Sequence, residues 1–491
     1  MKLRELARLL DCEVPSSDDA EVTAVTEDSR RVIPGAVFFA ARGEHQDGHE
    51  FAVQAASAGA VAIAGDRGDA REIGGVPYLR VPVPRKSLGI AAHAVAGDPS
   101  RHMTVIGITG TNGKSSSAVL AHHVLESSGT ATACLGTLGY EVAGERVPAR
   151  HTTPFAEDLA AAFKQAFDAG QTHVVMEVSS HALEQDRVSG IEFDVAAFTN
   201  LTQDHLDYHG DMERYLRAKL KLFEELEGPG RFAVVNRDDA NWEAFVHASK
   251  VGCWTYGSEG DCRAEDIRLS MDRTTFSAKT PWGEGRVEMH LLGRHNVSNA
   301  LAVVAICGGL GVKLDRIAEA IGSLASVPGR FEHINAGQPF QVIVDYAHTE
   351  DGLRNVLQAS RAICTGRIIA VFGCGGDRDK GKRPKMGAAA GELADLAIVT
   401  SDNPRTEDPE RIVLDVEAGL QDIGKRRDGD YLMILDRAEA IARGIAEARP
   451  GDLVLIAGKG HEDYQILGTT RIPFDDREVA RAVLQGQTGE A

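Results

Sequence analysis

Short apolar runs that end in polar or glycine-rich segments recur along most of the chain. Runs of this length, separated by stretches long enough for a helix, are typical of parallel strands in an α/β fold, where ligands bind beyond the carboxyl ends of the strands. We expect such strands at residues 105–109, 173–178, 194–199, 232–235, 341–344, 367–372, 396–400 and 453–457. The pattern therefore predicts an α/β protein with a parallel sheet in the middle of the chain and a second, doubly wound sheet near its end.

The run at residues 105–109 leads into a glycine loop and then into a segment with helical periodicity, in which Ala118, Ala121 and Leu125 share one face. Strand, glycine loop, Lys-Ser and helix together form a phosphate cradle. Backbone N–H groups face the anion, the lysine reaches the outer phosphates and the serine hydroxyl binds Mg2+. The strict pattern has glycine where this chain has Ile108, so a glycine-rich turn before an ordinary helix is the alternative. The predicted ATP-binding residues of this loop are Gly110, Thr111, Asn112, Gly113, Lys114 and Ser115.

Two breaks divide the 491 residues, Gly-Asp-Pro-Ser at 97–100 and Val-Pro-Gly-Arg at 327–330. A chain of this length is too long to form a single domain around one hydrophobic core, since domains typically hold roughly 100–200 residues. The first segment contains apolar runs at 36–40 and 60–64 around a helical stretch, which suits a small α/β unit. We therefore expect three domains, at residues 1–98, 99–329 and 330–491.

The composition is that of an ordinary globular protein, with 43% hydrophobic and 25% charged residues. Lysine and arginine number 53 against 72 aspartates and glutamates, and this formal charge of −19 argues against sequence-independent nucleic-acid binding. Seven scattered cysteines without a Cys-x-x-Cys pair indicate reduced thiols. No apolar run approaches the ~18 residues of a membrane span, and the first residues lack the pattern of a signal peptide. We expect a cytoplasmic protein without nucleic-acid or membrane partners.

Polar residues follow the predicted strands that flank the glycine loop. Glu177 ends the run at 173–178, and His205 follows the run at 194–199. A carboxylate in this place can complete Mg2+ coordination with Ser115 and phosphate oxygens. The alternatives are a solvated glutamate and a hydrogen-bonded histidine. Further acids and a histidine crowd the same loop, namely Asp204, Asp207 and His209.

Cationic loops follow the predicted strands near the end of the chain. The loop after residue 372 is no dinucleotide-binding fingerprint, because Arg378 stands where the third glycine is needed. Its many cations suit a carboxylate or phosphate ligand. The alternative interpretation is a charged loop that is exposed to solvent. Arg405 follows Asn403-Pro404 and offers bidentate binding to a carboxylate, unless it is an ordinary surface arginine. The residues alone thus predict an ATP- and Mg2+-dependent enzyme with cationic pockets in a separate carboxy-terminal domain, and they leave the substrate open.

The chain closely resembles the Mur ligase family from about Thr26 to Glu462. The segments that carry the resemblance are Asp28-Ser-Arg30, Gly110-Thr-Asn-Gly-Lys-Ser115, Thr152-Thr-Pro154, Glu177-Val-Ser-Ser-His-Ala-Leu183, Asn200-Leu-Thr-Gln-Asp-His-Leu-Asp207, His295-Asn296, Gly329-Arg-Phe-Glu332, Asp345-Tyr-Ala-His348, Gly376-Asp-Arg-Asp379, Asp402-Asn-Pro-Arg405 and Gly458-Lys-Gly-His-Glu462. The resemblance implies a UDP-binding domain at 1–98, a central P-loop ATPase domain at 99–329 and a Rossmann-like amino-acid-binding domain at 330–491. The chain most resembles those family members that add meso-diaminopimelate to UDP-N-acetylmuramoyl-L-alanyl-D-glutamate in cytoplasmic peptidoglycan synthesis.

The resemblance also implies roles for individual residues. Catalytic roles would fall to Lys114, Glu177, Lys219 and His205, and Mg2+ would be held by Ser115, Glu177, His205 and Lys219 carbamylated to N6-carboxylysine. Further ATP contacts would be Asn296, Arg330 and Asp345. The UDP-linked dipeptide would contact Ser29, His45, Gln46, His151, Thr152, Thr153, Ser179, Gln185 and Arg187, although the inserted Glu44 departs from the family's Gly-His-Gln. Diaminopimelate would contact Arg378, Asp402, Asn403, Pro404, Arg405, Gly458 and Glu462.

The reaction implied by the resemblance activates a carboxylate with ATP. The γ-carboxylate of the D-glutamyl residue attacks the γ-phosphate, and the amine of diaminopimelate then displaces phosphate from the acyl phosphate. Arg405 would select diaminopimelate by pairing with the carboxylate that lysine lacks. The alternatives are a lysine-adding or folate-polyglutamating relative and, from another class, a P-loop nucleotide switch. Asn403-Pro404-Arg405 and the UDP-side segments speak against the first two, and we expect a monomer.

Overall fold

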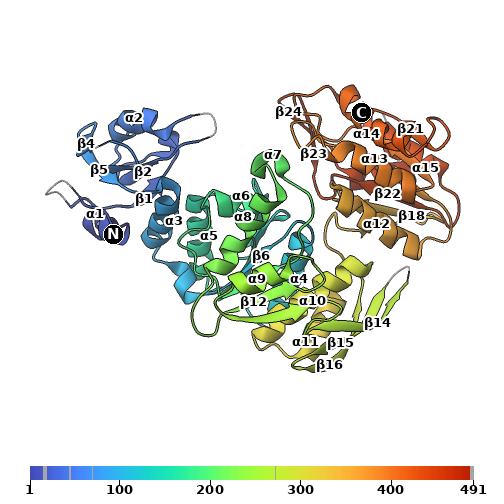
Figure 1. Ribbon diagram of the computed structural model, residues 1–491, viewed down its shortest axis with the longest axis horizontal. Coiled ribbons are helices and arrows are strands. Elements are labelled where there is room, and N and C mark those ends of the chain that lie inside the picture. Colours follow the sequence, from blue (N-terminus) through green and yellow to red (C-terminus); the bar gives the residue numbers. More distant parts are fainter. Residues whose placement is uncertain (15–18, 44–45, 69, 271–272, 487–491) are drawn as a thin grey trace.

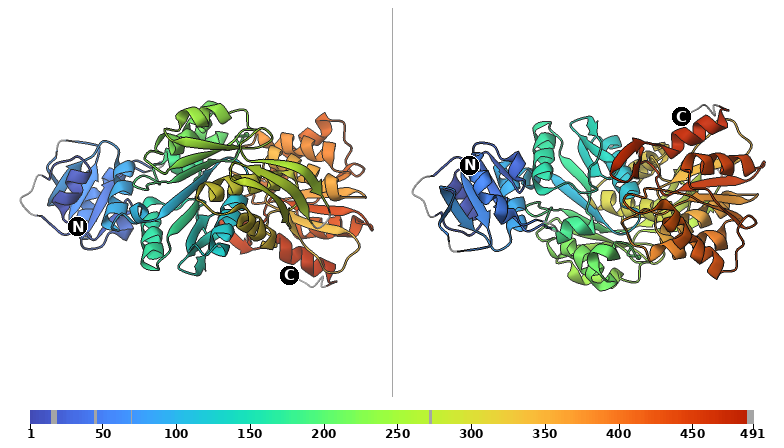
Figure 2. Two further views of the ribbon diagram at one scale, coloured as in Figure 1. Left: turned by 90° about the horizontal axis from the view of Figure 1, so that it is seen from below. Right: turned by 90° about the horizontal axis from the view of Figure 1, so that it is seen from above.

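The computed structural model describes residues 1–14, 19–43, 46–68, 70–270 and 273–486. Three bodies follow one another along the chain, each built around its own sheet. Figure 1 shows them in a row, with the amino-terminal body at one end, the central body in the middle and the carboxy-terminal body at the other end, and the views of Figure 2 agree. Within the described residues, the helices are all too short or too polar to cross a membrane.

The amino-terminal body is a small α/β unit whose sheet has the order β1-β2-β3-β5-β4. Its strands are β1 (Ala24–Thr26), β2 (Ala36–Ala40), β3 (Ala62–Gly65), β4 (Glu72–Ile73) and β5 (Val76–Arg80), and its helices are α1 (Leu3–Leu9), α2 (Ala52–Ser57) and α3 (Pro84–Val95), with short 3-10 turns at Ser29–Arg31, Gly48–Phe51 and Pro99–His102. Strand β2 is buried along its whole length. Ala156 and Ala160 of the next body complete this core, so the two bodies are packed together.

The central body has a sheet of order β13-β12-β11-β6-β10-β7-β8-β9. Its strands are β6 (Thr104–Thr109), β7 (Thr132–Gly136), β8 (Gly139–Val142), β9 (Glu145–Val147), β10 (His173–Glu177), β11 (Val195–Phe198), β12 (Phe232–Asn236) and β13 (Gly252–Tyr256). Strands β6, β7, β10, β11, β12 and β13 are parallel, whereas β8 and β9 add antiparallel pairs at one edge. The first strand in sequence, β6, lies inside the sheet between β10 and β11. The connections on its two sides therefore diverge, which opens a crevice beyond its carboxyl end.

Helices cover both faces of the central sheet and bury two hydrophobic clusters. One face carries α4 (Lys114–Ser127), α10 (Arg294–Gly309) and α11 (Leu314–Ser323), and the other carries α5 (Ala156–Asp168), α6 (Ser180–Glu184), α8 (Met212–Glu224) and α9 (Trp242–Ala248), with α7 (Leu206–His209) before α8. A strand buried on both faces needs apolar residues at every position, which is why the strands read as continuous apolar runs.

A small antiparallel sheet of order β14-β15-β16 packs beside α11 and was absent from the sequence-based expectations. It comprises β14 (Arg263–Leu269), β15 (Thr274–Thr280) and β16 (Gly283–Met289). Its strands alternate between buried and solvent-facing positions, as Phe276, Ala278 and Val287 join the core while Lys279 and Glu284 pair on the outside. Such half-polar strands carry no continuous apolar run.

The carboxy-terminal body has a sheet of order β17-β18-β22-β19-β20-β21. Its strands are β17 (Glu332–His333), β18 (Gln341–Asp345), β19 (Ile368–Phe372), β20 (Leu396–Val399), β21 (Tyr431–Met433) and β22 (Leu453–Ala457). Helices α12 (Glu350–Ile363), α13 (Lys382–Leu393) and α14 (Pro409–Asp422) cover one face, and α15 (Arg437–Glu447) and α16 (Asp476–Leu484) cover the other. A hairpin of β23 (Tyr464–Leu467) and β24 (Thr470–Pro473) follows β22.

The fold class predicted from the sequence is confirmed, since the chain is α/β with parallel sheets. The predicted strands also agree with the structure to within one or two residues at their ends. In the carboxy-terminal sheet, β22 lies between β18 and β19 and is parallel to both. The loops after β19, β20 and β22 therefore leave the same edge of the sheet, and this edge faces the central body.

Candidate active site

The glycine loop links β6 to α4 in the crevice of the central sheet. Gly110 has φ +147° and Gly113 has φ +85°, in the region that favours glycine. A Cβ at Gly110 would lie 1.8 Å from Thr199 Oγ1, and one at Gly113 would lie 2.5 Å from Asn299 Oδ1. Lys114 donates to the carbonyl oxygens of Gly110 at 2.9 Å and Thr111 at 2.8 Å. The loop thus curls around its own lysine, as a phosphate cradle does.

Glu177 ends β10 beside this loop and is 1% exposed. Its Oε2 accepts from Ser115 Oγ at 3.0 Å, and its Oε1 accepts from the Thr137 N–H at 2.7 Å. Arg330, which lies next to the carboxy-terminal sheet in sequence, also donates to Ser115 Oγ at 3.0 Å. The structure therefore brings Ser115, Glu177 and Arg330 together.

The donors at this point suit Mg2+. Ser115 and Glu177 supply a hydroxyl and a carboxylate, which are hard oxygen donors, next to a loop that can hold phosphate. Among the described residues, no group of three or more His, Cys, Asp or Glu could hold a metal ion alone. Mg2+ fits such a sparse set, because it commonly takes one or two protein carboxylates and completes its shell with phosphate oxygens and water.

Lys219 lies on α8 and is 1% exposed. Its ammonium donates to Gly110 O at 2.9 Å and lies 4.4 Å from the centre of the Tyr215 ring. Burial, together with the charge of Lys114, lowers the pKa of Lys219 well below its ordinary value. A buried cation beside a second cation is costly, which is the physical reason for the lowered pKa of Lys219.

His205 immediately precedes α7 with φ +55°, and its ring faces Asp204. Nε2 lies 3.4 Å from Asp204 Oδ2, and the ring packs edge-on against His181. Burial lowers the pKa of His205 to about 3, with Lys114 and Lys219 acting in the same direction. His205 thus lies near both lysines as a neutral imidazole, and its polar partner is Asp204.

The predicted dipeptide-binding residues of the central body form one connected group. Thr153 Oγ1 donates to Glu177 O at 2.8 Å and accepts from the Ser179 N–H at 3.0 Å. Arg187 donates to Thr153 O at 2.9 Å and to Gln185 Oε1. Thr152 accepts from Thr137 Oγ1, which in turn touches Glu177, and His151 accepts from Tyr140 through its carbonyl oxygen.

The predicted UDP-binding residues lie apart from this group, in the amino-terminal body. Ser29 begins the 3-10 turn Ser29–Arg31, which Asp28 caps by accepting from the Arg30 N–H at 3.0 Å. Gln46 is exposed, and its carbonyl oxygen accepts from the Gly43 N–H at 2.8 Å. His45 lies outside the described residues.

Of the remaining predicted ATP contacts, Asn296 is buried beside the glycine loop, and Asp345 is partly buried at the end of β18. Asn296 on α10 accepts from Asn299, whose Oδ1 faces Gly113. Asp345 ends β18 and accepts from the backbone N–H groups of Phe331 and Ala347, both at 2.7 Å. Burial raises the pKa of Asp345 above its ordinary value.

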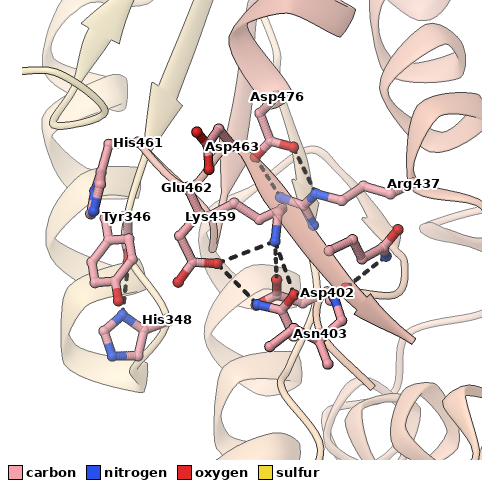
Figure 3. Close-up of polar contacts among 12 residues, drawn as sticks. Tyr346, His348, Asp402, Asn403, Arg437, Lys459, His461, Glu462, Asp463 and Asp476 are labelled. Atoms are coloured by element: carbon pink, nitrogen blue, oxygen red, sulfur yellow. Dashed lines mark hydrogen bonds and ion pairs between the residues drawn. The ribbon is translucent and has the colours of Figure 1, made fainter. Parts of the chain in front are cut away.

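The predicted diaminopimelate-binding residues gather on the three loops that leave the carboxy-terminal sheet. Asn403 donates to Glu462 Oε2 at 2.9 Å, and Arg405, with φ +52°, donates from Nη1 to Gly376 O at 2.7 Å. A Cβ at Gly376 would lie 1.9 Å from Pro404 O, so two of these loops are in close contact. Figure 3 shows Asp402, Asn403 and Glu462 around one lysine, Lys459.

One cavity of about 750 Å³ joins the central and carboxy-terminal bodies. Its lining includes the predicted residues His151, Thr152, Thr153, Ser179, Arg187, His205, Arg378, Asp402, Asn403, Arg405, Gly458 and Glu462. Residues to which the sequence assigned no role also line it, among them Arg146, Arg150, Tyr346, His348, Lys382, His461, Tyr464 and Arg471. Ser29 and Gln46 are not part of this lining. The cavity therefore has arginines on both sides, Arg187 from the central body and Arg378 and Arg405 from the carboxy-terminal body.

Comparisons with known proteins agree with this arrangement. Three family models match successive parts of the chain: "Mur ligase family, catalytic domain" at residues 21–96, "Mur ligase middle domain" at 108–307, and "Mur ligase, glutamate ligase domain" at 329–460. A protein of Geobacillus thermodenitrificans is 45% identical over 99% of this chain and 99% of its own length. The chain belongs to the Mur ligase family.

The relatives within the Mur ligase family carry one common name. The Geobacillus protein and one from Solibacter usitatus, 46% identical over 96% of this chain and 95% of that protein, are both named UDP-N-acetylmuramoyl-L-alanyl-D-glutamate–2,6-diaminopimelate ligase. A solved structure of the same name is 33% identical, covers both chains completely and has a TM-score of 0.69. A Thermotoga maritima Mur ligase solved with ADP, 19% identical with a TM-score of 0.66, shares the fold.

Proposed function

We propose that this chain is an ATP-dependent ligase that joins meso-diaminopimelate to UDP-N-acetylmuramoyl-L-alanyl-D-glutamate in the cytoplasm, as a monomer. The observation that carries the proposal is the shared cavity, in which the Thr153 group of the central body faces Arg405 and Glu462 of the carboxy-terminal body. The names of the similar proteins support the same substrates. We assign the UDP end to residues 1–98, ATP to 99–329 and the amino acid to 330–491.

The residues of the site account for the first half of the reaction. The glycine loop, with Lys114, would hold the phosphates of ATP, and Arg187 would hold the dipeptide so that its γ-carboxylate points at the γ-phosphate. Carboxylate oxygen then bonds to phosphorus while the bond to ADP breaks. Lys114 and Arg330 supply positive charge where two anions meet. Ser115 and Glu177 would hold Mg2+, which neutralises phosphate charge when bound.

The carboxy-terminal loops account for the second half. Glu462, held in place by Asn403, would take the ammonium group at the far end of diaminopimelate, and Arg405 its carboxylate. The amine at the near end then attacks the acyl carbon, loses a proton and displaces phosphate. Since an acyl phosphate is hydrolysed when water reaches it, the contact between the two bodies protects the intermediate.

Lys219 would act in carbamylated form. Its neutral amine adds to the carbon of CO2, an N–C bond forms, and one proton leaves, so that a buried amine becomes an anion. The resulting anion would be attracted by Lys114, whereas the Lys219 cation is repelled by it. It would also add a carboxylate-type oxygen to the Mg2+-binding set of Ser115, Glu177 and His205.

A ligation assay tests the proposed function. Purified protein is incubated with ATP, Mg2+, the UDP-linked dipeptide and either meso-diaminopimelate, L-lysine or L-glutamate, and the products are weighed by mass spectrometry. We expect one product, heavier than the dipeptide by diaminopimelate minus water. A lysine adduct of equal yield would contradict the substrate, and phosphate release that is independent of both substrates would contradict ligation in favour of a nucleotide switch.

A further inference from the structure

Lys459 is a fully buried cation directly beneath the diaminopimelate loops. It is 0% exposed and lies between Gly458 and Gly460 at the end of β22. Its ammonium donates to Asp402 Oδ1 at 3.3 Å, to Asn403 Oδ1 at 3.2 Å and to Glu462 Oε2 at 3.2 Å. Three acceptors match the three N–H donors of an ammonium group. All three acceptors line the cavity, whereas Lys459 lies behind them (Figure 3).

These contacts fix the orientation of the Asn403 amide. Its Oδ1 accepts from Lys459 and from the Ile466 N–H at 2.9 Å, so both of its lone-pair directions are used. Its Nδ2 must then point the other way, where it donates to Glu462 Oε2 at 2.9 Å. A flipped amide would place an NH2 group against two other donors, the ammonium of Lys459 and the Ile466 N–H.

The same contacts select one oxygen of Glu462 for the ligand. Oε2 accepts from both Asn403 and Lys459, and among the described residues Oε1 accepts from none. The side chain lines the cavity and is 16% exposed. One carboxylate oxygen is therefore locked by the protein, and the other is left as an acceptor for a cationic group in the cavity.

Lys459 also separates two acids that would otherwise repel each other. Burial alone would raise the pKa of Asp402, but Lys459 and Arg437 outweigh it and keep that carboxyl ionised. Burial, together with the charge of Asp402, raises the pKa of Glu462, and Lys459 opposes this rise. Without the lysine, the two buried carboxyl groups would tend to share a proton, and Glu462 would lose its anionic acceptor.

We propose that Lys459 is a positioning residue that holds Glu462 Oε1 ready for the ammonium group at the far end of diaminopimelate. The inference rests on the proposed function and adds a residue to it. Lys459 acts through Glu462 and Asn403, and it touches neither substrate nor ATP. Its removal should therefore weaken recognition of one amine specifically, and leave the use of ATP unchanged.

The test compares two amino acids that differ only at that amine. L-2-Aminopimelate keeps the reacting amine and both carboxylates of diaminopimelate, and lacks the far amine. In the wild-type protein we expect kcat/KM to be far higher for meso-diaminopimelate. In Lys459→Met the value for diaminopimelate should fall on the order of 10- to 100-fold, the range for losing a hydrogen bond to a charged group. The value for L-2-aminopimelate and the KM for ATP should each change less than about threefold, because a hydrogen bond that is not made cannot be lost.

Lys459→Met leaves the Glu462 carboxylate without its cationic partner, and this could impair folding. A double-substitution cycle keeps the inference testable in that case. Glu462→Gln removes the negative charge and replaces one carboxylate oxygen with an NH2 group, and Lys459→Met/Glu462→Gln removes both charges of the buried pair together. Because Lys459 acts through Glu462, the double variant should discriminate between the two amino acids as poorly as Glu462→Gln does, within about twofold. Tyr431→Phe is the matched control. Tyr431 lies on β21, the far edge strand of the same sheet, and its substitution removes a buried hydrogen bond to Glu417 of α14, so discrimination should stay unchanged.

Two results would overturn the inference. One is wild-type discrimination in Lys459→Met, and the other is a further loss of discrimination in the double variant relative to Glu462→Gln. Either is distinct from failure of the proposed function, which would appear as a wild-type protein that ligates neither amino acid.

Discussion

Arg405→Ala is the substitution that most sharply separates diaminopimelate from other amino acids. Arg405 is half-buried in the cavity lining, and its Nη1 is held by Gly376 O at 2.7 Å. Among the described residues, its Nε and Nη2 donate to no acceptor, so they can pair with a carboxylate. Its backbone N–H donates to Ile466 O at 3.1 Å, and this contact remains in alanine, which also keeps the local loop in place.

The expected magnitude follows from the lost ion pair. A hydrogen bond to a charged group contributes about 1.5–3 kcal/mol, which corresponds to a loss of roughly 10- to 160-fold in kcat/KM for diaminopimelate. Lysine has no carboxylate at its far end, so its kcat/KM should change less than about threefold. Arg405→Lys should fall between wild type and alanine, because a lysine keeps the charge and loses the bidentate geometry.

The assay is steady-state ligation with the amino acid varied at saturating ATP and UDP-linked dipeptide, followed by a second series in which ATP is varied. We expect the KM for diaminopimelate to rise far more than the KM for ATP. Equal losses for diaminopimelate and lysine, or equal effects on both KM values, would refute Arg405 as the residue that selects the substrate.

Three further substitutions test other parts of the account. Lys114→Ala should abolish ligation while the protein stays folded by circular dichroism, and substantial remaining activity would remove the glycine loop from the mechanism. Lys219→Ala should lose activity that added short carboxylic acids partly restore, whereas a fully active variant would show that no carbamate is needed. Asp476→Asn should lower the free energy of unfolding by about 3–5 kcal/mol, because it leaves the guanidinium of Arg437 without its carboxylate partner, and both side chains are 0% exposed. Chemical denaturation measures this value, and a loss below about 1 kcal/mol would contradict it.

The sequence predicted those elements of the fold that impose a local pattern of apolar residues. Strands buried on both faces, such as β10 and β22, must be apolar throughout, and their runs mark them in the sequence. The sheet of β14, β15 and β16 has no such pattern, because it is half-exposed and its strands mix Phe276 or Val287 with charged residues. Its place beside α11 is a tertiary property that no local pattern encodes.

The candidate site was predictable in part for the same reason. Glycines with positive φ and polar strand ends can be identified in the sequence, and they led to Gly113, Lys114 and Glu177. The burial of Lys219 and Lys459 could not be foreseen from local pattern, since a lysine on a helix or in a glycine loop is ordinarily exposed. The role of Lys219 follows from the family resemblance. The role of Lys459 follows only from the structure, which brings its three acceptors together around the ammonium group.

The central claim is that the glutamyl γ-carboxylate is activated by taking phosphate from ATP. The most direct measurement places ¹⁸O in that carboxylate, runs one ligation cycle with meso-diaminopimelate and weighs the inorganic phosphate released. The account predicts that one labelled oxygen enters each phosphate, because the acyl carbon loses the oxygen that was bonded to phosphorus. Phosphate that carries no label, formed along with ligated product, would contradict it.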